Sequence, residues 1–465
     1  MTKFDGRAIR RGAIAAVCFL GCIASCSSDR EEERRVAGPT TGRLGRSASS
    51  LTAEEVHAAA TVLVAHDHRL TTDELSAATT GGVSGLGIDL TVDGLDWDSG
   101  WRYPKTKYQI ASSFAAKVNN LNTIVNGSSG AYRIARTIQD IHDAKAANGV
   151  AVIIGSEGVN QIPGGWSTGN DVRASVRSLF NLGWRKTQVW YPAGGCENYD
   201  FTCSGSDTTF FANNAITSLG TTLIAELNRT GVVIDLEHLA GTPRSQVVGR
   251  TNAPVLHSHE YPSTSGQNSA TILQTAAHTG GGNGVIAIIF SAHEYRPSEA
   301  WGASTSTVVD VATELKKLAE IPTVGVDHLA LGGDYMPLNY TNDVSSRNTA
   351  LCPGGVCSDY QYVPATLADL QTLTAAMLGA CTTATGTHNP CFTPEETIKI
   401  LGQNLINLYD RVWDPTRGHS GGSARFYTCT NSSTSDECIK TRSYPFTGES
   451  MCSMPHCVRS IAVSA

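Results

Sequence analysis

The chain has 465 residues, of which 41% are hydrophobic and 17% charged, and its formal net charge is -7. A chain of this length and apolar content can bury a large core, which excludes a disordered body. No run of Lys and Arg follows the N-terminal region, so the basic footprint of a nucleic-acid-binding protein is absent from the sequence.

The first 25 residues have the pattern of a signal peptide. Basic residues precede an apolar stretch at 13–24 that is too short to span a bilayer. The stretch ends in Ile23-Ala24-Ser25-Cys26, which resembles the lipobox of bacterial lipoproteins, and an ordinary secretory signal is the alternative. We therefore expect residues 1–25 to be removed and lipidated Cys26 to anchor the protein to the cell envelope at the outer membrane. The rest of the chain would then lie outside the cytoplasm.

Residues 26–50 are first charged and then rich in Gly, Ser and Arg, which predicts a flexible tether. Beyond Leu51, short β-rich apolar runs alternate with longer amphipathic stretches. The runs predict strands at 61–65, 150–155, 188–191, 231–236, 254–256, 284–290 and 328–331. The stretches predict helices at 131–147, 171–182, 208–229 and 304–319.

Strands that alternate with helices over ~250 residues or more favour a parallel α/β fold, of which the (β/α)8 TIM-type barrel is the commonest at this size. A doubly wound open sheet is the alternative. We predict that the barrel occupies residues 51–425 and carries disulfide-rich loops. A cysteine-rich C-terminal extension, residues 426–465, is expected to pack on it.

Histidines and carboxylates follow the predicted strands at the points where the strands end. His66 and His68 come directly after the first strand, and alternate residues of an extended chain point the same way, so both imidazoles can reach one metal ion. Similar side chains follow four later strands: Glu157, His238, His259 and Asp334. In a barrel all these strand ends face the rim that carries active sites. Nitrogen and carboxylate ligands without sulfur suit zinc first, with manganese, cobalt or iron as alternatives.

Ten of the thirteen cysteines remain when Cys18 and Cys22 leave with the signal and Cys26 carries lipid. They form five pairs of sequence neighbours in loops: Cys196 and Cys203, Cys352 and Cys357, Cys381 and Cys391, Cys429 and Cys438, Cys452 and Cys457. No CxxC pair occurs, and an exported protein meets an oxidising compartment. We therefore expect local disulfides, with a thiolate zinc site as the alternative.

Together these segments resemble the membrane dipeptidase family (renal dipeptidase, peptidase family M19), within the amidohydrolase-like metal-dependent barrels. The resemblance runs from residue 63 to about residue 412. The segments that carry it are Thr79–Gly85, Ile154–Gly158, Gly231–His238, Ala253–His259, Gly325–Tyr335 and Leu401–Asn404.

The resemblance implies a binuclear zinc centre. His66 and His68 would bind one ion, His238 and His259 the other, and Glu157 would bridge the two. Asp334 would lie at the same centre as the catalytic acid/base. Two cations would lower the pKa of a bridging water so that hydroxide forms near neutral pH. The implied reaction is cleavage of a dipeptide or a related amide bond, with a small peptide or amide as the partner.

Three departures set this chain apart from the family pattern. His68 stands where the family usually has Asp. The segment Val189-Trp190-Tyr191 lacks the substrate-contacting histidine expected there, and no Arg-Asn pair follows His259 to contact a substrate carboxylate.

These departures keep two alternatives open. One is a metal-dependent barrel hydrolase of another bond, such as a lactone or phosphoester. Glu157 argues for the dipeptidase branch, because lactonase-like branches commonly use a carboxylated lysine as the bridge. The other is a surface lipoprotein that retains the barrel for binding, although such a protein would be expected to lose its ligands.

Overall fold

The structure, a computed structural model of the full chain, describes residues 51–92, 107–159, 168–190, 210–212, 215–239, 241–260, 284–295, 305–335 and 361–413. These residues lie in one compact unit, Arg46–Ala465. The predicted signal peptide, Cys26, the tether and the C-terminal extension lie outside the described residues. Within the described residues, we find no helix with the length and apolar character that a bilayer crossing requires.

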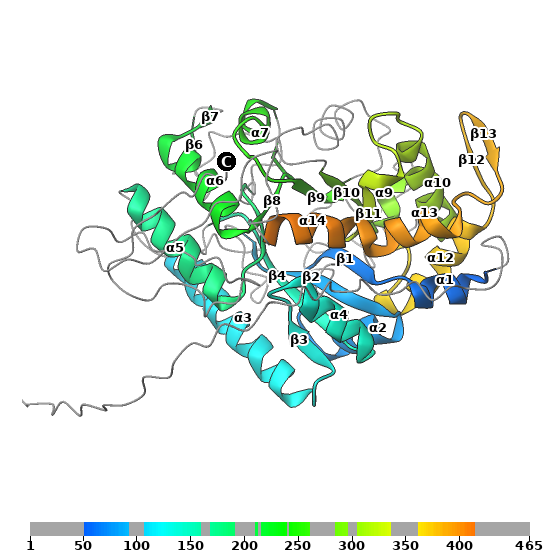
Figure 1. Ribbon diagram of the computed structural model, residues 1–465, viewed down its shortest axis with the longest axis horizontal. Helices are drawn as coiled ribbons and strands as arrows, with labels where there is room; N and C mark the ends of the chain where they lie inside the picture. The colour runs from blue at the N-terminus through cyan, green and yellow to red at the C-terminus, as the bar shows by residue number, and fades with distance from the viewer. Residues whose placement is uncertain are drawn as a thin grey trace, which may run out of the picture. The chain divides into compact units, whose positions relative to one another are not determined.

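Eight parallel strands pair in chain order and close into a barrel, which confirms the predicted fold. Figure 1 shows the strands with helices around them. They are β1 (Val62–Asp67), β2 (Val83–Val92), β4 (Val150–Glu157), β5 (Lys186–Gln188), β8 (Val233–Asp235), β9 (Val255–Glu260), β10 (Val285–Ile289) and β11 (Leu329–Gly333). The ring closes where β1 pairs with β11, with His66 opposite Gly333. A further strand, β3 (Tyr132–Ile134), pairs with the start of β4 outside the ring.

Helices connect the strands, and most begin in the same way. They are α1 (Ala53–Ala59), α2 (Thr72–Thr80), α3 (Lys107–Gly127), α4 (Ile138–Ala146), α5 (Gly169–Leu182), α6 (Ser218–Thr230), α7 (Gly241–Val248), α9 (Ala292–Tyr295), α10 (Val308–Ala319), α12 (Leu370–Leu378), α13 (Pro394–Ile398) and α14 (Asn404–Trp413). A threonine precedes many of them, and at α4 the Thr137 hydroxyl accepts from the Asp140 N–H while the Asp140 carboxylate accepts from the Thr137 N–H. Each such cap satisfies backbone donors that the first turn leaves unpaired.

Alternate residues of β1 enter two apolar clusters. Val62 and Val64 pack in the cluster that the strands share with the surrounding helices. Leu63 and Ala65 pack in a second cluster, to which α14 contributes Tyr409. Because β-strand side chains alternate between faces, the strands are buried on both sides, as expected for a parallel barrel.

Helix α14 closes the amino-terminal end of the barrel. Asn404 at its start donates to the carbonyl of Leu329, the first residue of β11. Trp413 at its end donates to the Arg185 carbonyl, just before β5. A short π-helical segment, η4 (Lys399–Gln403), leads into α14, and a Cβ on its Gly402 would lie 1.9 Å from the Thr61 carbonyl oxygen. Only glycine permits this close approach to β1.

Several predicted elements have different bounds. β2 was not among the predicted strands, because Gly85 and Gly87 interrupt its apolar run. The helix predicted at 131–147 is shorter, since residues 132–134 form β3 and Thr137 caps α4. The strand predicted at 188–191 is 186–188 instead.

The helix predicted at 208–229 begins only at Ser218, after the hairpin β6 (Phe211–Ala212) and β7 (Ala215–Ile216). β12 (Cys381–Thr383) and β13 (Gly386–His388) form a second hairpin. The disulfide Cys381–Cys391 links the start of β12 to the segment that follows β13. This is one of the five predicted cysteine pairs. The other four lie outside the described residues.

Candidate metal centre

The six side chains predicted as a metal site come from five strands and meet at the carboxyl-terminal end of the barrel. They are His66 in β1 and His68 just after it, Glu157 at the end of β4, His238 after β8, His259 in β9 and Asp334 after β11. Three overlapping trios among them have ligand atoms within 4.8 Å of one another: His66, His68 and Glu157; His66, His259 and Asp334; Glu157, His238 and His259. The structure therefore brings together all six predicted residues.

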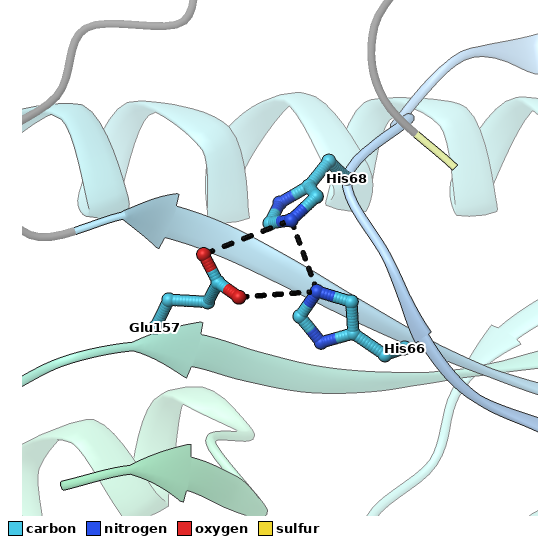
Figure 2. A group of neighbouring side chains, drawn as sticks. All are labelled: His66, His68 and Glu157. Atoms are coloured by element: carbon cyan, nitrogen blue, oxygen red, sulfur yellow. Dashed lines mark hydrogen bonds and ion pairs between the residues drawn. The ribbon is translucent and has the colours of Figure 1, made fainter. Parts of the chain in front are cut away.

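The first histidine group consists of His66 and His68, which Figure 2 shows together with Glu157. Their Nε2 atoms lie 2.9 Å apart. One oxygen of Glu157 lies 3.3 Å from the Nε2 atom of His66, and the other lies 3.7 Å from that of His68. Glu157 thus turns both carboxylate oxygens toward this histidine pair.

The second group contains His238 and His259, whose Nε2 atoms lie 3.2 Å apart. The Oε1 atom of Glu157 lies 3.5 Å from the Nε2 atom of His238 and 3.7 Å from that of His259. Since the same oxygen faces His66, Glu157 occupies the position between the two groups.

Asp334 faces the first group from the end of β11. Its Oδ1 atom lies 3.3 Å from the Nε2 atom of His68 and 3.4 Å from that of His66. The backbone of Asp334 has a φ of 68°, in the left-handed region that side chains rarely adopt, and its N–H donates to the His66 carbonyl. His238 has a φ of 61°. Such strain at two neighbouring polar residues is typical of functional sites.

The donor atoms fit a metal ion. An imidazole protonated on Nδ1 presents an Nε2 lone pair, and facing lone pairs at about 3 Å repel one another unless a proton or a cation lies between them. Here four Nε2 atoms and carboxylate oxygens converge in a buried space. Nitrogen and oxygen donors without sulfur suit zinc, manganese, cobalt or iron.

The surrounding charges keep both carboxylates ionised. Burial by itself would raise the pKa of Glu157, but the imidazoles of His68, His238 and His66 lower that pKa to about 2. Burial would likewise raise the pKa of Asp334, and the histidines around it hold that pKa well below its usual value. Ionised carboxylates are the form that binds a cation.

Neighbouring side chains hold the second group in place. The Ser258 hydroxyl lies 3.0 Å from the Nδ1 atom of His259. The two oxygens of Glu237 accept from the backbone N–H groups of His238 and His259, at 3.3 and 3.4 Å. His257 in turn places its Nδ1 atom 2.8 Å from Glu237 and 3.0 Å from Glu260.

Sequence reasoning missed several polar residues at this centre. Gln188 is fully buried, and its side-chain amide donates to the Oε1 atom of Glu157 at 2.9 Å. Asp89 and Lys186 lie inside the barrel beside His66. Asp89 carries a signal in the sequence, because it interrupts an apolar run, but Lys186 lies in the polar segment Lys186–Gln188 and carries none. Trp190, which follows where the family histidine was expected, is 1% exposed and packs against Phe211.

Comparisons with known proteins identify the family. Residues 91–349 match the family described as membrane dipeptidase, peptidase family M19. Dipeptidase verJ of Clonostachys rogersoniana is 22% identical over 236 residues, which cover 49% of this chain and 54% of that protein. An uncharacterised dipeptidase of Schizosaccharomyces pombe is 26% identical over 189 residues, 40% of this chain and 41% of that protein. The chain thus matches about half the length of these relatives.

Solved structures share the fold. An amidohydrolase from Pseudomonas aeruginosa superposes with a TM-score of 0.58 at 16% identity, over 78% of this chain and 99% of that one. A metallopeptidase from Rhodobacter sphaeroides, solved with a phosphinate mimic of the dipeptide L-Ala-D-Ala, has a TM-score of 0.53 at 18% identity, over 76% and 99%. These alignments reach beyond the family match and cover most of this chain.

Proposed function

Because the chain belongs to the membrane dipeptidase family, peptidase family M19, we propose that it is a metal-dependent hydrolase that cleaves a dipeptide or a related amide bond. The observation that carries the proposal is the convergence of four histidine Nε2 atoms and two carboxylates at the carboxyl-terminal end of the barrel. Five strands contribute these groups, and substrate sites of this fold lie at that end.

Each residue has a proposed role at the centre. His66 and His68 would hold one zinc ion, His238 and His259 a second, and Glu157 would bridge them. When bound, two such ions would supply an activated water and polarise the scissile carbonyl. Glu157 has the position for a bridge, because its Oε1 atom faces a histidine of each group.

Asp334 is proposed to move the proton. Its carboxylate is ionised and lies beside the histidine pair, so it can accept a proton from the attacking water and deliver it to the amine nitrogen that leaves. The left-handed backbone at Asp334, fixed by its N–H bond to His66, holds the carboxylate in this position. Asp334 also contributes a ligand atom to one of the trios.

The proposed substrate class is based on the similarity of this chain to known dipeptidases. The Rhodobacter sphaeroides metallopeptidase binds a mimic of L-Ala-D-Ala, which makes that dipeptide a first choice for testing. The segment Val189-Trp190-Tyr191 lacks the family's substrate-contacting histidine, and Trp190 is buried, which favours keeping one alternative, a related barrel hydrolase of a lactone or phosphoester. We also propose that the protein is exported and held at the membrane by lipidated Cys26.

The test combines metal analysis with a substrate panel. Purified protein should contain up to two zinc ions per chain and cleave L-Ala-D-Ala or another dipeptide. Removal of metal by a chelator should abolish cleavage, and added zinc should restore it. A folded protein without bound metal would contradict the hydrolase proposal. Bound metal with cleavage of a lactone or phosphoester and of no dipeptide would favour the alternative.

A further inference from the structure

A buried ion pair crosses the barrel interior beneath the metal centre. Lys186 in β5 places its Nζ atom 2.5 Å from the Oδ1 atom of Asp89 in β2, and both side chains are 0% exposed. Strand β4 lies between these two strands, so the contact passes through the interior and not along neighbouring strands. A buried pair is costly to desolvate, so a contribution to stability alone is a weak explanation for its presence.

Strand β4 makes room for the pair. A Cβ on Gly155 would lie 1.9 Å from the Oδ1 atom of Asp89 and 2.7 Å from the Cε atom of Lys186. Gly155 precedes Glu157 by two residues, so both face the barrel interior. The strand that supplies the bridging carboxylate therefore also leaves the space in which Asp89 and Lys186 meet.

The pair contacts His66 on the ring atom that faces away from the centre. The Oδ2 atom of Asp89 lies 3.1 Å from the His66 Nδ1 atom. The Nζ atom of Lys186 lies 3.4 Å from the same nitrogen, which is the longer contact. Lys186 thus occupies one oxygen of Asp89 and leaves the other within hydrogen-bonding reach of the His66 Nδ1–H group.

We propose that Asp89 and Lys186 are positioning residues for His66, which keep its proton on Nδ1 and its Nε2 lone pair turned toward the metal centre. A neutral imidazole carries one N–H, and the partner of the outer nitrogen decides which nitrogen carries it. At 3.1 Å from Nδ1, the Asp89 carboxylate would accept that N–H, and Lys186 would fix the orientation of the carboxylate. The inference rests on the proposed metal centre.

The decisive variant is Asp89→Asn. Lys186 donates hydrogen bonds, so it would attract the amide oxygen and turn the amide N–H groups toward His66. Nδ1 would then accept a hydrogen bond, the proton would move to Nε2, and the lone pair facing the centre would be lost. We expect zinc affinity to fall by about 10- to 100-fold, the usual range for residues that support a ligand.

The double variant Asp89→Asn/Lys186→Met separates this mechanism from a purely structural role. Without the ammonium, the amide can rotate and offer its oxygen to the His66 N–H. We expect zinc affinity to recover to within about tenfold of wild type. If the pair only stabilised the fold, removing the second partner would not restore affinity.

The measurements are zinc titration calorimetry and the visible absorption of Co²⁺-loaded protein, which reports ligand geometry without any substrate. Tyr409→Phe is the matched control. The Tyr409 hydroxyl is buried with no hydrogen-bond partner among the described residues. Its removal should leave zinc affinity and the cobalt spectrum unchanged.

Unchanged zinc affinity in Asp89→Asn would overturn the inference and leave the hydrolase proposal intact. The inference would also be overturned if the double variant bound zinc no more tightly than Asp89→Asn. If Asp89→Asn does not fold, the double variant is compared with Asp89→Leu/Lys186→Met, which offers His66 no acceptor. The former should bind zinc about tenfold tighter, and equal affinities would refute the inference. Wild-type protein that binds neither ion would overturn the metal centre and this inference together.

Discussion

The two histidine groups of the centre are supported in different ways. His66 is held from inside the barrel by a carboxylate that is itself paired with a buried ammonium. His259 has a neutral hydroxyl, that of Ser258, at the corresponding ring nitrogen. Hydrogen bonds to charged groups are roughly twice as strong as those between neutral groups. The His66 ring is therefore more firmly oriented than the His259 ring, and we expect the first group to bind its metal ion more tightly than the second.

Glu157→Gln should produce the largest effect, because it alters the carboxylate that the two groups share. We expect zinc content to fall at both positions and cleavage to be lost, beyond the 10- to 100-fold typical of supporting residues. Elemental analysis of purified protein measures the zinc. Glu226→Gln, which alters a buried glutamate paired with Arg229, is the matched control and should retain both ions. Full zinc occupancy in Glu157→Gln would contradict the proposal that both groups share Glu157 as a ligand.

Asp334→Asn should separate proton transfer from metal binding. We expect kcat to fall by about 10²- to 10⁴-fold, the usual contribution of a general acid/base, while most of the zinc is retained. The measurement is kcat for dipeptide cleavage alongside zinc content. If zinc in the first group falls as steeply as kcat, Asp334 acts mainly as a ligand.

Ser258→Ala tests the weaker support of the second group. The variant removes the hydroxyl beside the His259 Nδ1 atom, and zinc affinity at one of the two positions should fall by up to about tenfold. Asp89→Asn should lower zinc affinity by more than Ser258→Ala does, and at the position held by His66 and His68. Calorimetry that resolves two binding events can compare the variants. A larger effect from Ser258→Ala would reverse the ranking of the two groups.

His57→Gln probes a buried histidine outside both groups and should have the smallest effect on zinc affinity. His57 contacts the Thr374 hydroxyl and the Gly81 carbonyl, and burial lowers its pKa. The unfolded chain therefore takes up this proton at a higher pH than the folded protein. The stability that neutral His57 contributes is present above the unfolded pKa of about 6.5 and is lost as the pH falls through the folded pKa.

Near pH 7.5, His57→Gln should lower stability by about 1–3 kcal/mol through the loss of two hydrogen bonds. The gap in melting temperature between wild type and variant should narrow on acidification. Zinc affinity near pH 7.5 should match wild type. A gap that widens at low pH would contradict the direction of the pKa shift.

The strand-end residues could be predicted because their type and spacing carry the chemistry directly. His66 and His68 follow an apolar run at a spacing of two, and His238 and His259 each end a comparable run. Parallel strands bring such positions to one rim whatever the connecting loops are. The family match, in contrast, begins at residue 91 and does not include the first histidine pair.

The layer beneath the rim could not be predicted in the same way. Asp89 and Lys186 are far apart in sequence, and their contact depends on two strands facing each other across a third. Only the closed barrel reveals that Gly155 leaves space between them. β2 itself was missed, because its glycines weaken the apolar pattern that marks a strand. The hairpin β6–β7 shortened the predicted α6 helix through local pairing that periodicity does not show.

The pairing of β1 with β11 also determines when the protein can fold. β1, the first barrel strand in the chain, has one neighbour close in sequence, β2, while its other neighbour, β11, is the last barrel strand. α14, which closes the amino-terminal end through Gly402 and Asn404, follows later still. Contacts between residues so distant in the chain slow folding and leave an open strand edge in the meantime. A chain that has not yet added β11 and α14 to the barrel therefore exposes one edge of β1 and the amino-terminal end of the barrel.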